Sequence, residues 1–325
     1  MTQTEEVQGE ELPADARAMM QLDEAVSLAT RLLGRSPDRA TVFQPRAGGN
    51  DSQQFRLWIG GRGLLLKVML RSETPLGAYF HARLRRASVP VPELVSFSAD
   101  GGPLGAACGI FEWVEGRPAE FDSHERPPYD EAEFGRMLRA IHSLRHDRGF
   151  GRLDDHGATS HGRWTDWIGD FLEWSVSACV TRRALRPQLA ESVLALPARF
   201  ADDLRAAPPA LLHYGDIMHN GNMIIDPPSR RILAVVDFSD AIVGDPRLEL
   251  AWVDLYFGAH GYFGRGFDLA RFRLAYGDEA DSGDPLRLLC VALALVTMLT
   301  YVDPGSERGR HHGALLERVV SELGV

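Results

Sequence analysis

The sequence predicts an α+β fold in which a small β-rich lobe precedes a larger, mainly helical lobe. Between residues 36 and 116, short runs rich in apolar, β-branched and aromatic residues alternate with Gly-rich turns, which is typical of hairpin strands. From Asp130 onward, apolar residues recur at the three- and four-residue spacing of amphipathic helices. The expected organisation is a flexible N-terminus at 1–17, a small β-rich lobe at 18–115 and a helical lobe at 116–325.

The small lobe is expected to hold two helices and five strands. The apolar spacing predicts the first helix, and a Val-Pro-Val-Pro segment ends the second. The strands are the apolar runs between turns such as RAGGNDS, GRG and ADGGP. The expected helices are Asp23–Leu33 and Leu76–Arg86, and the expected strands are 41–45, 54–60, 64–70, 93–98 and 108–114.

The large lobe is expected to be helical apart from a hairpin at 221–238. Its first helix contains Phe134, Met137, Leu138, Ile141 and Leu144 at helical spacing. The apolar run at 286–302 is interrupted by Arg287 and is short for a membrane span, which favours a buried helix. The other expected helices are 164–180, 186–205, 246–258, 267–275, 284–301 and 313–322.

Composition narrows the function classes. The chain has 325 residues, enough for two lobes with cores, and its net charge of −10 argues against a general nucleic-acid binder. That charge is compatible with a cationic small-molecule partner, although an acidic surface that only keeps the protein in solution explains it as well. The three cysteines lie far apart and indicate neither a zinc site nor disulfides. No signal peptide or membrane segment is visible, so we expect a cytoplasmic protein, either monomer or homodimer.

Residues 213–240, HYGDIMHNGNMIIDPPSRRILAVVDFSD, hold the most informative polar cluster. Asp216 follows the apolar strand 210–212, where a carboxylate can orient the proton of an attacking hydroxyl. Asn222 and Asp237 adjoin short apolar runs and offer oxygen atoms of the kind that Mg²⁺ binds. Each of these residues could instead stabilise a turn, and Asn220 competes with Asn222 as the metal ligand.

Lys67 lies within the apolar run LLLKVML. A buried ammonium needs an anionic partner such as a carboxylate or a phosphate, although a lysine on an edge strand would point to solvent. The Gly-rich turn Arg46–Ser52 could bring backbone N–H groups close to phosphates, but hairpin turns are often Gly-rich for conformational reasons alone.

Taken in order, these motifs resemble the aminoglycoside phosphotransferase and choline-kinase-like family of the protein-kinase-like fold. The matching elements run from about Thr41 to Phe257. The resemblance implies a bilobal kinase-like fold and a phosphotransferase that uses ATP or GTP with Mg²⁺. It also implies that GRMLRAIHSL is the family's helix ending in Leu-His-x-Leu, with His142 in a structural role, and that GDPRLELA at 244–251 is the segment after the metal-binding aspartate.

The resemblance implies a role for each candidate residue. Asp216 would be the catalytic aspartate, with Asn222 and Asp237 as the Mg²⁺ ligands. Lys67 would hold the α- and β-phosphates, and the linker IFEWVEG would bind adenine through its backbone. The implied nucleotide-binding residues are Gly48, Gly49, Asn50, Ser52, Lys67, Glu112, Trp113 and Val114.

Three departures from the family pattern stand out. Tyr214 is inserted between His213 and Gly215, and five residues rather than four separate Asp216 from Asn222. DFSD replaces Asp-Phe-Gly. The helix GAYFHARLRR lacks the glutamate expected to pair with Lys67, and Glu73, just before it, is the substitute candidate.

The resemblance also implies that the acceptor binds in the helical lobe, beside Asp216. Acidic side chains could hold a cationic acceptor there, although a solvated helix face explains several of them equally well. Three tryptophans on the helix at 164–180 indicate core packing more often than ligand stacking. The acidic candidates are Asp240, Glu249, Asp254 and Asp170, the last with Asp166 and Glu173 on one helix face.

The sequence therefore predicts an ATP- and Mg²⁺-dependent kinase that phosphorylates a hydroxyl of a small molecule, with an aminoglycoside-type antibiotic as the first candidate acceptor. The second hypothesis is a kinase of a metabolic alcohol such as choline, homoserine or a sugar. A non-catalytic, nucleotide-binding pseudokinase is the third, because of the departures from the family pattern.

Overall fold

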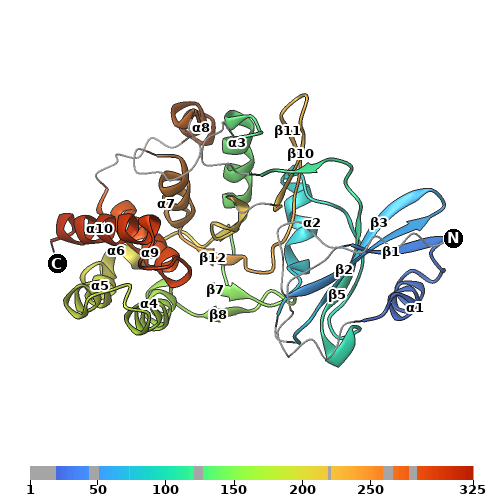
Figure 1. Cartoon of the computed structure of the whole chain (residues 1–325), viewed down its shortest axis with the longest axis horizontal. Coiled ribbons are helices and arrows are strands. Elements are labelled where there is room, and N and C mark those ends of the chain that lie inside the picture. Colours follow the sequence, from blue (N-terminus) through green and yellow to red (C-terminus); the bar gives the residue numbers. More distant parts are fainter. Residues whose placement is uncertain are drawn as a thin grey trace.

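The computed structural model describes residues 20–43, 51–72, 74–120, 127–218, 221–258, 266–277 and 284–324. They form a small β-rich lobe and a larger, mainly helical lobe (Figure 1), which confirms the predicted fold class. Of the predicted features, the N-terminus at 1–17, the turn residues Gly48, Gly49 and Asn50, Glu73 and Asn220 lie outside the described residues.

The small lobe is built on an antiparallel five-stranded sheet. The strands follow the order β1-β2-β3-β5-β4, and β2 alternates half-buried and buried residues, as a sheet covered on one face requires. Helix α1 packs on that covered face through Ala25, Leu28 and Ala29. The elements are α1 (Leu22–Leu33), β1 (Arg39–Phe43), β2 (Ser52–Ile59), β3 (Arg62–Met69), β4 (Leu94–Ser98) and β5 (Cys108–Glu112).

Helix α2 (Ala78–Arg86) follows the small-lobe strand β3 but packs with the large-lobe core, where Phe80 and Leu84 are buried. Asp155, in a turn of the large lobe, accepts hydrogen bonds from the N–H groups of Leu76 and Ala78 at 2.8 Å each. The start of α2 is therefore tied to the large lobe by hydrogen bonds as well as by its apolar face.

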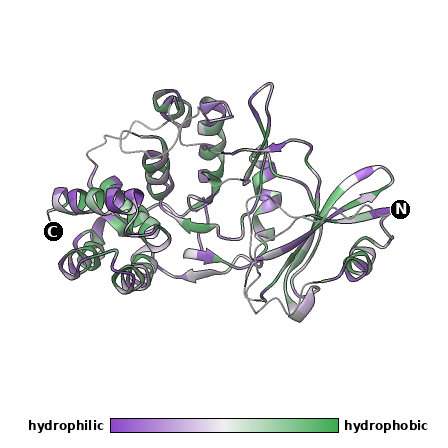
Figure 2. Ribbon diagram, viewed as in Figure 1, coloured by the Kyte–Doolittle hydropathy of each residue, from purple (hydrophilic) through white to green (hydrophobic). Residues whose placement is uncertain are grey.

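The large lobe surrounds one hydrophobic core. Figure 2 shows hydrophobic and hydrophilic residues alternating around its helices, as expected for helices with one buried face. Cys108, Cys179 and Cys290 are buried free thiols. The helices are α3 (Glu131–His142), α4 (Trp164–Thr181), α5 (Pro187–Arg199), α6 (Ala201–Arg205), α7 (Pro246–Phe257), α8 (Leu269–Tyr276), α9 (Pro285–Tyr301) and α10 (Glu307–Glu322).

Two small sheets position the polar residues of 213–240. The predicted hairpin is present and pairs with a short strand from the segment that joins the lobes. A four-stranded sheet of order β8-β7-β12-β9 carries the strand that precedes Asp216. The strands are β6 (Arg117–Pro118), β7 (Phe150–Leu153), β8 (Thr159–His161), β9 (Ala210–Leu212), β10 (Met223–Asp226), β11 (Arg231–Val235) and β12 (Ile242–Gly244).

The structure differs from the sequence expectation in three places. Strands β6, β7, β8 and β12 are additional, so the hairpin is not the only β-structure of the large lobe. The helix expected at 186–205 divides at Phe200, whose φ of −105° departs from helical geometry. Helix α10 begins at Glu307, six residues earlier than expected, because the Ser306 side chain caps it by accepting from the Gly309 N–H.

Within the described part of the chain, no helix combines the length and the hydrophobicity that crossing a membrane requires.

Candidate active site

The catalytic-loop candidate Asp216 opens the 3₁₀ turn Asp216–Met218, just after β9. The chain reaches it through two left-handed residues, Tyr214 (φ 65°) and Gly215 (φ 76°). Gly215 is required here for a second reason, since a Cβ atom would lie 2.6 Å from the Trp252 ring. The backbone thus turns sharply between the buried strand and Asp216.

Glu249 of α7 holds this turn from inside the lobe. Its carboxylate accepts hydrogen bonds from the backbone N–H groups of His213 (2.8 Å) and Gly215 (3.0 Å) and from His142 Nε2 of α3 (3.0 Å). Burial alone would raise the pKa of Glu249, but the hydrogen bonds and the neighbouring His142 and His213 outweigh it and lower that pKa. Glu249 is therefore a buried anion that fixes the loop leading to Asp216.

Asn222 touches Asp216 directly. Its side-chain N–H₂ donates to the Asp216 carboxylate at 2.7 Å and to the Asp216 backbone carbonyl at 2.9 Å. These bonds direct the amide nitrogen toward Asp216, so the amide oxygen is the atom that can serve as a metal ligand. The Asn222 backbone connects to the segment after β11, since the Val236 N–H donates to the Asn222 carbonyl at 2.9 Å.

Asp237 lies just after β11 and binds Lys67 of β3. The Lys67 Nζ donates to Asp237 Oδ1 at 2.6 Å, and the Ser239 hydroxyl donates to the same oxygen at 2.6 Å. Although burial would raise the pKa of Asp237, the Lys67 charge and these hydrogen bonds lower it to about 2. Of the two alternatives that the sequence left open for Lys67, the structure shows the buried one, with Asp237 as its anionic partner.

His213 and His81 of α2 lie near the Lys67–Asp237 pair but form no hydrogen bond with it. His213 is fully buried, donates from Nε2 to the Val236 carbonyl at 3.0 Å, and packs on Phe238. His81 also packs on Phe238 and belongs to α2, the helix that lacks the expected glutamate. Burial lowers the pKa of His81 to about 4, so it is neutral near pH 7 and offers Lys67 no negative charge.

The linker residues Glu112, Trp113 and Val114 run from the end of β5 toward β6. The N–H groups of Glu112 and Trp113 donate to the carbonyls of Glu93 and Gly63. The Trp113 ring packs under the Arg56 guanidinium, 4.0 Å from the ring centroid. Ser52 begins β2, on the small-lobe side of the site.

The carboxylates proposed for the acceptor are not free in the structure. Glu249 has no exposed surface, so its assignment to acceptor binding is wrong, because backbone N–H groups and His142 occupy it. Asp254 is bound at both oxygens by arginines of α8 and α9. The pairs are Arg273 with Asp254 Oδ1 at 2.8 Å and Arg287 with Asp254 Oδ2 at 2.7 Å.

The remaining acidic candidates lie at the surface and are also paired. Asp240 is 3.4 Å from Arg152, and Asp170 is 3.0 Å from His161. Partial burial raises the pKa of Asp240, and the nearby Asp216 and Asp237 carboxylates raise it further against the effect of Arg152. Asp240 therefore lies close enough to Asp216 for that carboxylate to raise its pKa.

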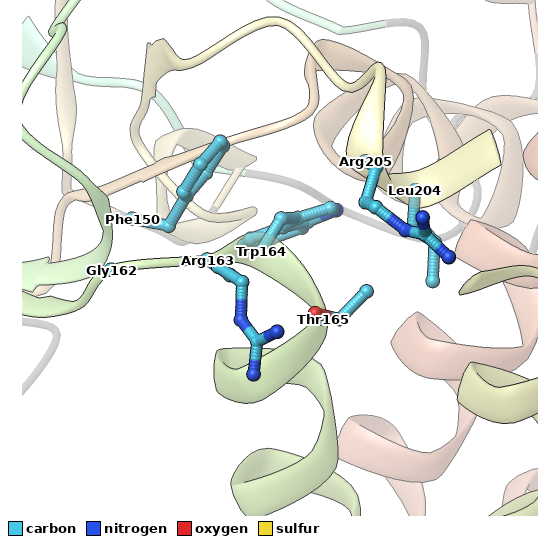
Figure 3. A pocket seen from close by; sticks show the side chains of 7 residues that line it. All are labelled: Phe150, Gly162, Arg163, Trp164, Thr165, Leu204 and Arg205. Atoms are coloured by element: carbon cyan, nitrogen blue, oxygen red, sulfur yellow. The ribbon is translucent and has the colours of Figure 1, made fainter. Parts of the chain in front are cut away.

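A cavity of about 200 Å³ lies elsewhere in the large lobe, at the start of α4 (Figure 3). Its lining includes Phe150, Trp164 and Leu204 together with the side chains of Arg163 and Arg205. None of the four central residues Asp216, Asn222, Asp237 and Lys67 lines it. The cavity is thus separate from the candidate active site.

The geometry pairs Lys67 with Asp237 and Asn222 with Asp216, four of the residues that the sequence nominated for catalysis, phosphate binding and metal binding. It also adds three that sequence reasoning missed in these roles, namely Glu249 as the loop anchor, Asp155 at the start of α2 and Tyr214 beside Asp216. Only Tyr214 carried a signal, because it interrupts the family's His-Gly-Asp pattern.

Comparison with solved structures shows the same fold. A thermostable mutant of aminoglycoside phosphotransferase APH(4)-Ia, in ternary complex with AMP-PNP and hygromycin B, has a TM-score of 0.60 and 18% identity, covering 91% of this chain and 98% of that one. A candidate fructosamine-3-kinase from Thermobifida fusca has a TM-score of 0.60 and 20% identity, with 93% and 99% covered. A candidate aminoglycoside phosphotransferase from Ralstonia eutropha has a TM-score of 0.57 and 17% identity, with 93% and 97% covered.

A search of curated proteins found no match. The model of the phosphotransferase enzyme family, by contrast, matches residues 42–288, from the first strand of the small lobe to the beginning of α9. That span contains the whole cluster of Lys67, Asp216, Asn222 and Asp237. The chain therefore belongs to the phosphotransferase enzyme family, as the resemblance in its motifs predicted.

Proposed function

We propose that this protein transfers the γ-phosphate of ATP to a hydroxyl group of a small molecule, with Mg²⁺ as cofactor. The observation that carries the proposal is the convergence of two bonded pairs, Lys67 with Asp237 and Asn222 with Asp216. Phosphoryl transfer from a metal-bound nucleotide requires one positive side chain, two carboxylates and a neutral oxygen ligand, and these two pairs supply all of them.

The donor set fits Mg²⁺. The Asp237 carboxylate and the Asn222 amide oxygen are hard oxygen ligands, and Mg²⁺ in nucleotide sites takes one or two protein carboxylates and completes its shell with phosphate and water. Mg²⁺ would neutralise the charge that develops on the phosphates. Lys67 would exchange its bond to Asp237 for contacts with the phosphates, since both are anionic partners within its reach.

Asp216 acts on the acceptor. Its carboxylate would accept a hydrogen bond from the acceptor hydroxyl and orient the oxygen toward the γ-phosphorus. As the new O–P bond forms, the bond between the γ-phosphorus and the β,γ-bridging oxygen breaks, ADP leaves and the hydroxyl proton passes to Asp216. Asn222 holds this carboxylate and Glu249 holds its backbone, so both position Asp216 before the acceptor arrives.

The linker would hold adenine, with Val114 supplying a backbone contact and Ser52 and the Gly48–Asn50 turn covering the phosphates. An aminoglycoside-type antibiotic is the first acceptor class to test, because the similar APH(4)-Ia structure contains hygromycin B. A metabolic alcohol is the second. The absence of the helix glutamate gives little support to a pseudokinase, because Asp237 supplies Lys67 with a carboxylate partner.

The test is Asp216→Ala, assayed for ADP formation and for phosphorylated acceptor across aminoglycosides, macrolides, choline and sugars. We expect kcat to fall at least about 100-fold, the usual loss when a general base is removed. The Kd for AMP-PNP should change by less than about threefold, because Asp216 would contact the acceptor and not the nucleotide.

Asp226→Ala is the matched control, since it removes a carboxylate from the adjacent strand β10 that bonds the Ser229 hydroxyl at the hairpin turn, away from the catalytic residues. Activity should persist in this variant. Undiminished phosphate transfer by Asp216→Ala would contradict the assigned role.

A further inference from the structure

The cavity at the start of α4 combines apolar and cationic walls. Phe150, Trp164 and Leu204 supply the apolar surface. Arg163 and Arg205 supply guanidinium groups on either side of Trp164 (Figure 3), and none of the described residues that line the cavity carries a carboxylate. Its volume of about 200 Å³ exceeds the engineered cavity of about 150 Å³ that binds benzene, so one ring with a small head group fits.

The first turn of α4 forms one side of this cavity, since Gly162, Arg163, Trp164 and Thr165 all line it. The residue that precedes the helix, Arg163, forms no side-chain cap with the backbone N–H groups of that turn. The N-terminus of a helix carries a partial positive charge and attracts anions. The backbone therefore adds to the positive potential of the two guanidinium groups.

The indole N–H of Trp164 is a buried donor on the wall of the cavity. Trp164 is 1% exposed, and its Nε1 has no hydrogen-bond partner among the described residues. In Figure 3 this nitrogen lies on the side of the ring toward Arg205. Stacking on Trp167, at 4.6 Å between centroids, holds the ring in place. Because a buried donor without an acceptor is costly, a ligand that brings an acceptor to Trp164 is favoured.

Both arginines keep donors for such a ligand. Arg163 binds Asp166 through Nε and Nη2. Arg205 binds Asp202 through Nη2 and the Ala201 carbonyl through Nε. In the part of the chain that the structure describes, neither Nη1 group forms a hydrogen bond. The two ion pairs lie at the surface, where such pairs contribute little, so an anion can also compete for the other donors.

We propose that this cavity is a second binding site, for a small anion whose carboxylate or phosphate group is attached to one apolar ring. The anionic group would bind Arg163 and Arg205 and accept a hydrogen bond from the Trp164 N–H. The ring would pack against Phe150 and Leu204. The site lies apart from the four central residues of the candidate active site, so the inference goes beyond the proposed function and does not depend on it.

The first test follows the indole N–H signals of the full chain by ¹H–¹⁵N NMR. The anionic probes are benzoate and phenyl phosphate, and benzamide is the neutral counterpart of benzoate. Trp164→Phe identifies the Trp164 signal by its loss, so the shift of that signal reports binding at this cavity and not at the active site. At least one anionic probe should shift it saturably and bind at least about tenfold more tightly than benzamide, because charge-assisted hydrogen bonds need the anion. The order of the two anionic probes distinguishes a carboxylate ligand from a phosphate ligand.

Two variants assign the binding to the guanidinium groups. Arg163→Gln and Arg205→Gln should each weaken binding of the preferred probe at least about fivefold, since each removes one cationic partner of the anion. Arg183→Gln, which removes an exposed guanidinium just beyond the other end of α4, is the matched control and should bind like the wild type. The Kd for AMP-PNP should be unchanged in all three variants.

The absence of a saturable shift of the Trp164 signal with both anionic probes would overturn the inference. Equal affinity for benzamide and the anionic probes would also overturn it, because it would show an apolar cavity without selection for charge. Unchanged affinity in both Arg163→Gln and Arg205→Gln would contradict the assigned role of the guanidinium groups. These measurements need neither nucleotide nor acceptor, so their outcome is independent of whether the protein transfers phosphate.

Discussion

At the scale of single residues, Asp237 combines backbone strain with a favourable ion pair. Its φ of 61° places a non-glycine residue in the left-handed region, which aspartate tolerates at a cost. The Lys67 and Ser239 hydrogen bonds at 2.6 Å offset that cost and hold the carboxylate ionised. The residue that would bind the metal is therefore kept in place by its own neighbours.

This pairing predicts a pH-dependent stability. The pKa of Asp237 falls from an ordinary 3.8 to about 2, so the ionised group stabilises the fold at pH values above 3.8, and that contribution is lost as the pH falls through 2. Wild type should exceed Asp237→Asn in unfolding free energy by about 2 kcal/mol at about pH 6 and by about 1 kcal/mol at about pH 3. Urea unfolding at both pH values measures the difference.

Asp240→Asn serves as the control, because the pKa of Asp240 is raised rather than lowered. Its ionised form opposes folding, so the difference between wild type and this variant should change with pH in the opposite sense. A pH-independent difference for Asp237→Asn would contradict the proposed ion pair.

At the scale of elements, the active site depends on how helices anchor loops. Helix α7 begins at its cap Asp245, whose side chain accepts from the Arg247 N–H. One turn later it presents Glu249 to the loop that bears Asp216. Helix α3 adds His142, which bonds Glu249 through one ring nitrogen and the Tyr276 hydroxyl of α8 through the other at 2.8 Å. Helix α3 thus binds the Glu249 carboxylate directly through His142, and α8 holds His142 in place through Tyr276.

Glu249→Gln should therefore lower kcat, although Glu249 would not contact the substrates. The glutamine amide has the shape of the carboxylate but no negative charge. Its NH₂ group would face the backbone N–H groups of the loop, which are also donors, so at least one hydrogen bond to the loop should be lost. We expect a loss of about 2 kcal/mol in unfolding free energy and a fall of about tenfold in kcat, with the KM for ATP nearly unchanged. Steady-state kinetics and urea unfolding provide the measurements.

Glu191→Gln, on α5 and outside this network, is the control for the charge change itself. A kcat equal to that of wild type in Glu249→Gln would show that the anchor has no catalytic importance.

The sequence predicted the longer elements because their patterns are strong and local. The alternation in β2 and the helical spacing in α3 are visible without any tertiary information. Strands β8 and β12 have three residues each, and β12 is buried throughout, so neither offers an alternation to detect. Glu249 was assigned to the acceptor because its true partners are distant in sequence, 34 and 36 residues away in the chain.

At the scale of the whole molecule, charged contacts join the two lobes at the site. Lys67 comes from the small-lobe sheet and Asp237 from the large lobe, while Asp155 binds the start of α2. The sequence predicted Lys67, Asp216, Asn222 and Asp237 from their order along the chain. Which carboxylate pairs with Lys67 could not be predicted, because the choice depends on how the lobes meet.

A nucleotide between the lobes should therefore bind through Lys67 on one side and through Mg²⁺, Asn222 and Asp237 on the other. The most direct measurement is calorimetric titration of AMP-PNP with and without Mg²⁺, on wild type and on Asp237→Asn. Mg²⁺ should tighten wild-type binding at least about tenfold and should have little effect on the variant. Equal gains in both proteins, or no effect of Mg²⁺ on the wild type, would contradict a metal-assisted phosphotransfer site.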